Sequence, residues 1–176
     1  KKYSKKYNYK FVILRYFNVA GASPSNRIGE INKSHGHLFK NMSIQALKKK
    51  PVINVYGNDY QTKDGTCIRD YIHVTDLSDI HVKSLDYLNN KKKSLIINCG
   101  YGKGYSVLDI AKIFKKIKKS LIINFKGRRA GDIAQVFAKN NKLKNVLKWK
   151  PKYNNIKLIL SSAIKWEQKL KIKNNL

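Results

Sequence analysis

Residues 11–22 read FVILRYFNVAGA, a mostly apolar run of strand length that ends at a polar residue. An unbroken apolar run is typical of a strand that is buried on both faces of a parallel sheet. We therefore predict a buried strand over 11–17 that ends at Asn18 and leads into a loop rich in Gly, Ser, Pro and Asn. Ligands of open α/β sheets bind outside the carboxyl ends of the strands, so Asn18 is a candidate contact residue.

Strand-like and helical patterns alternate along the rest of the chain. The first ten residues read as the end of a basic helix, and Ser106 with Asp109 resembles a capping box that opens a later helix. Thr75 is a candidate cap for another helix. We predict further helices over 37–50, 76–89, 106–118, 140–147 and 156–170, and strands over 53–57, 68–74, 94–100 and 121–125. This alternation predicts an α/β fold.

Length and composition limit the class of protein. The chain has 176 residues, enough for one domain or one domain with part of another. No apolar run approaches the ~18 residues of a membrane-spanning helix, so we expect no membrane partner. Two cysteines, Cys67 and Cys99, are too few for a disulfide framework or a zinc cluster, and they favour the cytoplasm.

The formal net charge is +28, which raises the possibility of a basic nucleic-acid-binding protein. Of the 38 cationic residues, however, only five are Arg. Recognition of phosphates and bases favours the bidentate fork of Arg, whereas drift of surface residues in an A/T-rich genome favours Lys. We favour drift and keep a nucleic-acid surface as the less favoured alternative.

Two motifs are interpreted as structural. The segment CGYGKGYS (99–106) lies between a strand and a helix, but Tyr105 occupies the position at which GxGxxG requires glycine. We therefore predict a tight turn there and no dinucleotide site. His35 and His37 form an HxH pair, but no carboxylate–histidine grouping in the sequence supports a metal ligand set, so no metal site is predicted.

The Arg-bearing segments are more informative. Arg69 follows DGT, and Arg128 and Arg129 precede a Gly-Asp turn. Three Arg residues, an Asn amide and an aromatic ring such as Tyr56 would suit a nucleoside diphosphate, because guanidinium forks bind phosphate oxygens and Asp accepts from ribose hydroxyls. The alternative is a set of structural Arg–Asp pairs.

Five segments together carry a resemblance to a known family. They are LRYFNVAGA (14–22), YGNDYQTKDGTCIRDYIHVTDL (56–77), NCGYGKGYSVLDI (98–110), RRAGD (128–132) and LKWKP (147–151). In order and spacing they resemble the UDP-glucose 4-epimerases of galactose metabolism, a branch of the extended short-chain dehydrogenase/reductases. Related UDP-sugar epimerases and decarboxylases share single motifs and remain an alternative.

The resemblance implies an NAD-dependent isomerase with an N-terminal Rossmann domain for NAD and a smaller domain for UDP-glucose or UDP-galactose. By this resemblance, residues 1–22 are a residual Rossmann segment. Residues 23–176 are the sugar-nucleotide-binding domain, with one or more strands that return to the Rossmann sheet. The catalytic Tyr-x-x-x-Lys motif and most NAD contacts are expected before Lys1, so we expect the isolated chain to be inactive and the complete protein to be a homodimer.

The resemblance also implies roles for individual residues. Phe17 is expected beside the nicotinamide, and Asn18, Arg69 and Arg129 are expected on the diphosphate. Asp132 is expected on the ribose, while His37 and Leu38 contact the nucleotide, and Asn54 and Tyr56 flank the uracil. Val136 is expected to limit the size of the sugar, and its small side chain suggests room for a 2-N-acetyl group. Lys40 replaces a proline of the family, while Arg128, Asp70 and His73 are expected to brace the loops.

Overall fold

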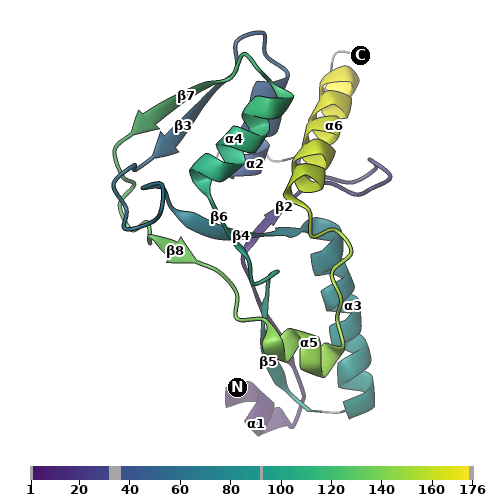
Figure 1. Ribbon diagram of the computed structural model, residues 1–176. Helices are drawn as coiled ribbons and strands as arrows, with labels where there is room; N and C mark the ends of the chain where they lie inside the picture. The colour runs from purple at the N-terminus through teal and green to yellow at the C-terminus, as the bar shows by residue number, and fades with distance from the viewer. Residues whose placement is uncertain (1, 32–36, 92, 175–176) are drawn as a thin grey trace.

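The computed structural model describes residues 2–31, 37–91 and 93–174 (Figure 1). The helices are α1 (Lys2–Tyr7), α2 (Leu38–Ala46), α3 (Val74–Lys91), α4 (Val107–Ile117), α5 (Asn141–Leu147) and α6 (Ile156–Asn174). The strands are β1 (Val12–Tyr16), β2 (Asn18–Ala20), β3 (Val52–Tyr56), β4 (Ile68–His73), β5 (Leu95–Cys99), β6 (Gly104–Ser106), β7 (Ile122–Lys126) and β8 (Gln135–Val136). The predicted α/β alternation is confirmed.

Strand β4 connects the two ends of the molecule. Its second half pairs in parallel with β2, and its first half lies between antiparallel β6 and parallel β8. At one end, β1 pairs in parallel with β5 beside α3 and α5; at the other, β3 pairs in parallel with β7 near α2, α4 and α6 (Figure 1). Segments that are far apart in the sequence therefore meet around β4.

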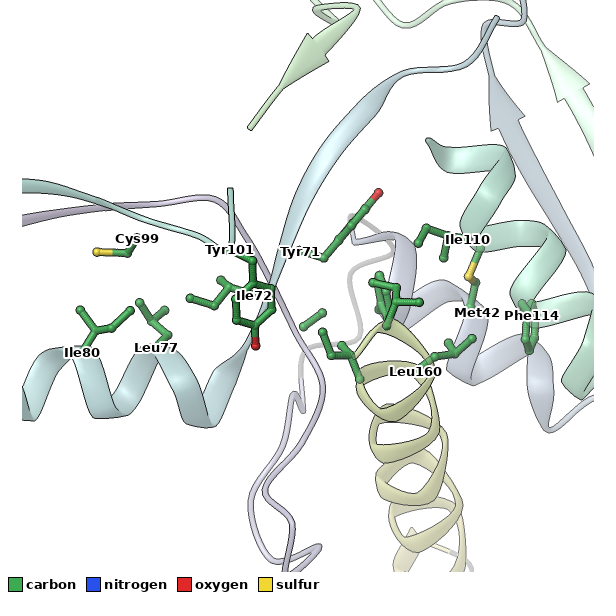
Figure 2. Packing of buried hydrophobic residues seen from close by; sticks show 14 of the residues in the cluster. Met42, Tyr71, Ile72, Leu77, Ile80, Cys99, Tyr101, Ile110, Phe114 and Leu160 are labelled. Carbon is green, nitrogen blue, oxygen red and sulfur yellow. The ribbon is translucent and has the colours of Figure 1, made fainter. Parts of the chain in front are cut away.

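One hydrophobic core runs through both ends. Figure 2 shows Leu77 and Ile80 of α3 on one side of β4 and Met42, Phe114 and Leu160 from three other helices on the opposite side. Ile72 of β4 lies between the two groups and is fully buried. Because the core is continuous, α6 near the end of the chain is packed against the elements that carry the candidate site residues.

Most helix boundaries agree with prediction to within a few residues, and one cap is confirmed in detail. The Ser106 hydroxyl accepts a hydrogen bond from the Asp109 amide at 2.9 Å, as expected for an N-cap. Helix α3, by contrast, begins at Val74, so Thr75 lies inside it and is not its cap. Helix α2 ends at Ala46, before the predicted end at residue 50, and the intervening residues form turns.

The prediction for residues 11–18 was wrong in two respects. Strand β1 is not buried on both faces, since Ile13 and Tyr16 are 39% and 56% exposed. Within the described residues β1 pairs with β5 alone, and a two-stranded sheet covers neither its outer edge nor both faces. Asn18 does not end this strand; it opens the separate strand β2, where it lies opposite Tyr71 of β4.

Two short strands were also missed. The segment after the predicted Gly-Asp turn contains β8, and the predicted tight turn after β5 contains β6. Both pair with the first half of β4. Strands of two or three residues carry too short a pattern to be seen in the sequence, and here they form because β4 offers hydrogen-bonding groups on both edges.

Candidate functional site

A pocket of about 460 Å³ lies between α2, β3, the first half of β4 and the loop after β7. It gathers most of the candidate site residues from five separate segments. Eight of the ten line it: Asn18, His37, Leu38, Asn54, Tyr56, Arg69, Arg129 and Asp132. Strand pairing explains this in part, because β2 and β8 both pair with β4, and β7 pairs with β3, so residues distant in the sequence come to lie side by side.

Arg69 enters the pocket because of its position on β4. Neighbouring residues of a strand point to opposite faces, so Arg69 faces the pocket while Asp70 faces the interior. Arg69 Nη1 donates to the carbonyl of Ile68 at 2.9 Å, and Nη2 donates to Asp132 Oδ1 at 3.4 Å. The Arg69 side chain is 16% exposed, so its charge is held in a fixed and partly desolvated position.

Asp132 reaches Arg69 through the pairing of β8 with β4. In that parallel register Gln135 lies opposite Ile68, and the Ile68 amide donates to the carbonyl of Ala134 at 2.8 Å. The loop that carries Asp132 is therefore held along the first half of β4. A guanidinium and a carboxylate with free oxygen positions lie together, which suits a ligand that has both phosphate oxygens and hydroxyl groups.

The adjacent arginines Arg128 and Arg129 have different surroundings. The Arg129 guanidinium lies 3.8 Å from the centroid of the Tyr56 ring, inside the pocket. Strands β3 and β7 are parallel, with Tyr56 opposite Lys126, so the residues that follow β7 come to lie beside the end of β3. Stacking on the ring leaves the N–H groups at the edge of the guanidinium available to an anion.

Arg128 turns away from the pocket and binds the 58–66 loop. Its Nε donates to Asp59 Oδ1 at 2.8 Å, and its guanidinium stacks on Tyr60 at 4.2 Å. The hydrogen bond from Arg128 lowers the pKa of Asp59 below its usual value of 3.8. Gly57 permits this arrangement at a φ of +78°, since a side chain there would collide with the Tyr60 ring.

His37 and Leu38 form the rim at the start of α2, together with Asn18. The His37 side chain is 69% exposed, and its Nδ1 lies 3.4 Å from Glu30 Oε1. Asn18, His37 and Leu38 also line a smaller hollow of about 210 Å³ on the other side of the rim. Phe17 lies in this smaller hollow and not in the main pocket.

Val136 is outside the lining of both hollows, although it lies opposite Arg69 in the β4–β8 pairing.

The pocket has further polar groups that the sequence reasoning did not single out. Asn41, Gln45 and Lys48 face it from α2 and the turn that follows. Their i, i+4, i+7 spacing is that of one helix face, and this polar stripe was a signal available in the sequence.

Asp70 braces three segments around the site. Its carboxylate accepts hydrogen bonds from the amides of Tyr101 (3.1 Å), Gly102 (2.8 Å) and Ala138 (3.1 Å). Burial raises the pKa of Asp70 above 3.8, against the opposing effect of these three donors. The side chain thereby joins β4 to the β5–β6 turn and to the segment after β8.

The glycines of the 99–106 turn serve protein packing. A side chain at Gly100 would meet Asp70 Oδ2 at 2.5 Å, and one at Gly102 would meet the Asn140 amide at 3.1 Å. Protein groups therefore occupy the space beside these glycines. This agrees with the structural interpretation of the motif.

Two Tyr-x-x-x-Lys spacings occur in the chain, Tyr87–Lys91 and Tyr153–Lys157, although the catalytic motif of the family is expected before Lys1. Neither tyrosine lines the pocket. Tyr87 packs against the core from α3, and the Tyr153 ring stacks on His73 at 4.7 Å. Both positions are structural.

Metal and membrane features can be stated for the described part of the chain. Among residues 2–31, 37–91 and 93–174, no group of three His, Cys, Asp or Glu side chains is placed to hold a metal ion. His35 of the HxH pair lies outside the described residues. No helix in these ranges has the length and apolar character needed to cross a membrane.

The fold and this pocket define a Rossmann-like α/β protein with a pocket that is lined by arginines and aromatic rings and is suited to an anion. A model of the NAD dependent epimerase/dehydratase family matches residues 1–100, and the chain belongs to this family. Over 160 residues the chain is 42% identical to a UDP-glucose 4-epimerase of Azospirillum brasilense, covering 90% of the chain and 46% of that relative.

Solved structures agree with this assignment. UDP-glucose-4-epimerase from Stenotrophomonas maltophila, bound to NAD and formylated UDP-arabinopyranose, matches with a TM-score of 0.88 and 33% identity over 93% of the chain and 49% of its own length. UDP-glucuronic acid 4-epimerase from Bacillus cereus, in complex with UDP-glucuronic acid and NAD, matches with a TM-score of 0.77 and 25% identity over 96% of the chain and 48% of its own length. The chain thus spans about half the length of the relatives it matches.

Proposed function

We propose that the chain is the UDP-sugar-binding part of an NAD-dependent UDP-glucose 4-epimerase. The observation that carries the proposal is the convergence of Arg69, Arg129 and Asp132 in one pocket with Tyr56. In this pocket the guanidinium groups of Arg69 and Arg129 bind the diphosphate, and the Asp132 carboxylate accepts a hydrogen bond from a ribose hydroxyl. Tyr56 and Asn54 flank the uracil, and Asn18, His37 and Leu38 form the remaining contacts.

Isothermal titration with UDP, UMP and uridine tests this proposal. We expect UDP to bind more tightly than UMP, and UMP more tightly than uridine, because each phosphate adds charge-assisted hydrogen bonds to the arginines. The chain carrying both Arg69→Met and Arg129→Met should lose the difference between UDP and uridine. Equal affinities of the unchanged chain for all three ligands, or no binding of UDP, would contradict the proposal.

Chemistry on the sugar requires groups that we assign to a separate NAD-binding part. The family reaction needs a base and a hydride acceptor, and none of the described residues that line the pocket belongs to a Tyr-x-x-x-Lys motif or to the 99–106 turn. Phe17, in the smaller hollow, is the residue that we assign to the nicotinamide. The isolated chain mixed with NAD and UDP-galactose should form no UDP-glucose; measurable turnover would overturn this assignment.

The outer edge of β1 is the surface that we assign to the NAD-binding part. Within the described residues this edge offers an unpaired row of backbone groups, and Ile13 and Tyr16 of the same strand have exposed side chains. Adding a strand to such an edge is a common route for two segments to form one sheet.

By this proposal residues 1–22 complete the Rossmann part, residues 23–176 hold the sugar nucleotide, and the complete protein is a homodimer. The two free cysteines suit the cytoplasm.

A UDP-uronic acid epimerase is a second candidate, favoured by the match to the UDP-glucuronic acid 4-epimerase. Analysis of the products of the complete enzyme separates the two candidates.

For sugar selectivity, we propose that the small Val136 side chain leaves room for UDP-GlcNAc. Val136→Tyr in the complete enzyme should then lose N-acetyl substrates selectively, and unchanged selectivity would reject the role of Val136.

A further inference from the structure

A buried ion pair joins α2 to α6 behind the pocket rim. Lys40 Nζ donates to Glu167 Oε2 at 2.7 Å, and the side chains are 5% and 15% exposed. The same Nζ donates to the carbonyl of Glu30 at 3.0 Å. A lysine is rarely buried to this extent without a specific partner, because removing its charge from water costs several kcal/mol.

The ion pair is part of a larger attachment to the loop after β2. The Trp166 indole N–H also donates to the Glu30 carbonyl, at 3.0 Å. Gly29 packs against the Trp166 ring so closely that a side chain there would lie 2.5 Å from ring atoms. Helix α6 therefore holds both the 21–31 loop and the first turn of α2.

These segments carry the rim of the pocket. Lys40 follows His37 and Leu38 in the first turn of α2, and the attached loop follows Asn18. Lys40, Glu30 and Glu167 also line the smaller hollow that shares Asn18, His37 and Leu38 with the main pocket. A shift of α2 relative to α6 would thus move the rim without changing any residue in it.

We propose that Lys40 and Glu167 are positioning residues for nucleotide binding. Their ion pair fixes the first turn of α2 against α6 and so sets where His37 and Leu38 lie. An apolar pair of the same volume would bury a similar surface but could pack in several ways. Lys40 Nζ must reach both Glu167 Oε2 and the Glu30 carbonyl oxygen, and this requirement fixes the position of α2 relative to α6. This inference rests on the proposed function, because it concerns the same pocket.

The test compares UDP affinity in K40M, E167Q and the charge-swapped K40E/E167K protein. Lys169→Met is the matched control, since Lys169 Nζ also donates from α6 to this loop, at the Asn26 carbonyl (2.8 Å), but is exposed and does not reach α2. We expect about tenfold weaker binding in each single variant, tighter binding in the swap than in either single variant, and no change in K169M. The swap restores the ion pair but not the hydrogen bond to the Glu30 carbonyl, so its recovery is partial.

Affinities are measured at a temperature at which the far-UV circular dichroism of each variant matches that of the unchanged chain. If K40M does not meet this condition, E167Q, which keeps an acceptor oxygen for Lys40, decides the test. A pair that is merely structural would lower the melting temperature of the variants and leave their UDP affinity unchanged, and that result would overturn the inference alone. Failure of the unchanged chain to bind UDP would overturn the proposed function and this inference with it.

Discussion

Arg69 Nη2 lies 3.4 Å from Asp132 Oδ1, although 63 residues separate them in the chain. The two side chains meet because β8 pairs in parallel with β4 and carries the preceding loop alongside. In the proposed function, the same two groups bind neighbouring parts of one ligand. A diphosphate would share the guanidinium, and a ribose hydroxyl would donate to the carboxylate.

Replacing Arg69 by Met should weaken UDP binding by about tenfold or more, since a hydrogen bond to a charged group contributes roughly 1.5–3 kcal/mol. The Arg69→Lys variant should bind UDP with intermediate affinity, because lysine keeps the positive charge but cannot form the bidentate hydrogen bonds of a guanidinium group. Titration calorimetry measures both. An Arg69→Met protein with unchanged affinity would remove Arg69 from the site.

Asp132 is tested by changing the ligand and the protein together. The unchanged chain should bind 2′,3′-dideoxy-UDP several-fold more weakly than UDP, because Asp132 would lose its hydroxyl donors. Asp132→Ala should bind both nucleotides alike. If the ratio of the affinities for UDP and dideoxy-UDP is the same in Asp132→Ala as in the unchanged chain, a residue other than Asp132 contacts the ribose.

The two neighbouring arginines provide an internal control. Arg129→Met should weaken UDP binding about tenfold. Arg128→Met should leave it unchanged, since Arg128 binds Asp59 and Tyr60 outside the pocket. Equal losses in the two variants would indicate a general effect of positive charge on nucleotide binding.

Tyr56 has a role that depends on its ring. Tyr56→Phe keeps an aromatic face for Arg129 and for a base, so its UDP affinity should match that of the unchanged chain. Tyr56→Ala should bind UDP about tenfold more weakly, as stacking on a base contributes roughly 1–3 kcal/mol. The predicted stacking is wrong if Phe and Ala have the same effect.

His73 should make the stability of the chain depend on pH below about 6.5. Burial lowers the pKa of His73 below its usual 6.5, with Asp76 opposing the shift. The unfolded chain therefore binds the proton more strongly, and the free energy of unfolding falls as the pH drops below 6.5 towards the folded-state pKa. His73 belongs to the framework: its Nδ1 accepts from the Thr75 amide at 3.1 Å.

Urea unfolding at pH 7.5 and pH 5.5 measures this effect. His73→Asn keeps an acceptor for the Thr75 amide and removes the titrating ring, so it should be less stable at pH 7.5 but lose less stability on acidification. A variant with the pH dependence of the unchanged chain would show that another group titrates.

Parts of the site were predictable from the residues themselves. The chain has 33 Lys and only five Arg, so the few motifs that contain Arg indicated positions at which the planar, bidentate guanidinium group is needed to bind an anion. The resemblance then selected ten residues, eight of which line one pocket, while Phe17 and Val136 do not. Their roles in binding UDP stay predictions until the ligand is titrated.

Other features depended on contacts that no local pattern carries. Arg128 and Arg129 are adjacent and chemically identical, yet one faces a loop and the other faces the pocket. The Lys40–Glu167 pair joins residues 127 positions apart, and the strands β6 and β8 exist because β4 lies between them. In each case the partner comes from a distant segment, so its identity follows from how the elements pack.

The amino-acid sequence determined the α/β alternation, the capped start of α4 and the residue types that can bind a nucleotide, because helix periodicity, capping and side-chain chemistry are local properties. Tertiary structure decided that Asn18 opens a new strand, that β1 is partly exposed and that α6 holds the pocket rim. Strand pairing and burial depend on groups far along the chain, and their free energy appears only when those groups meet.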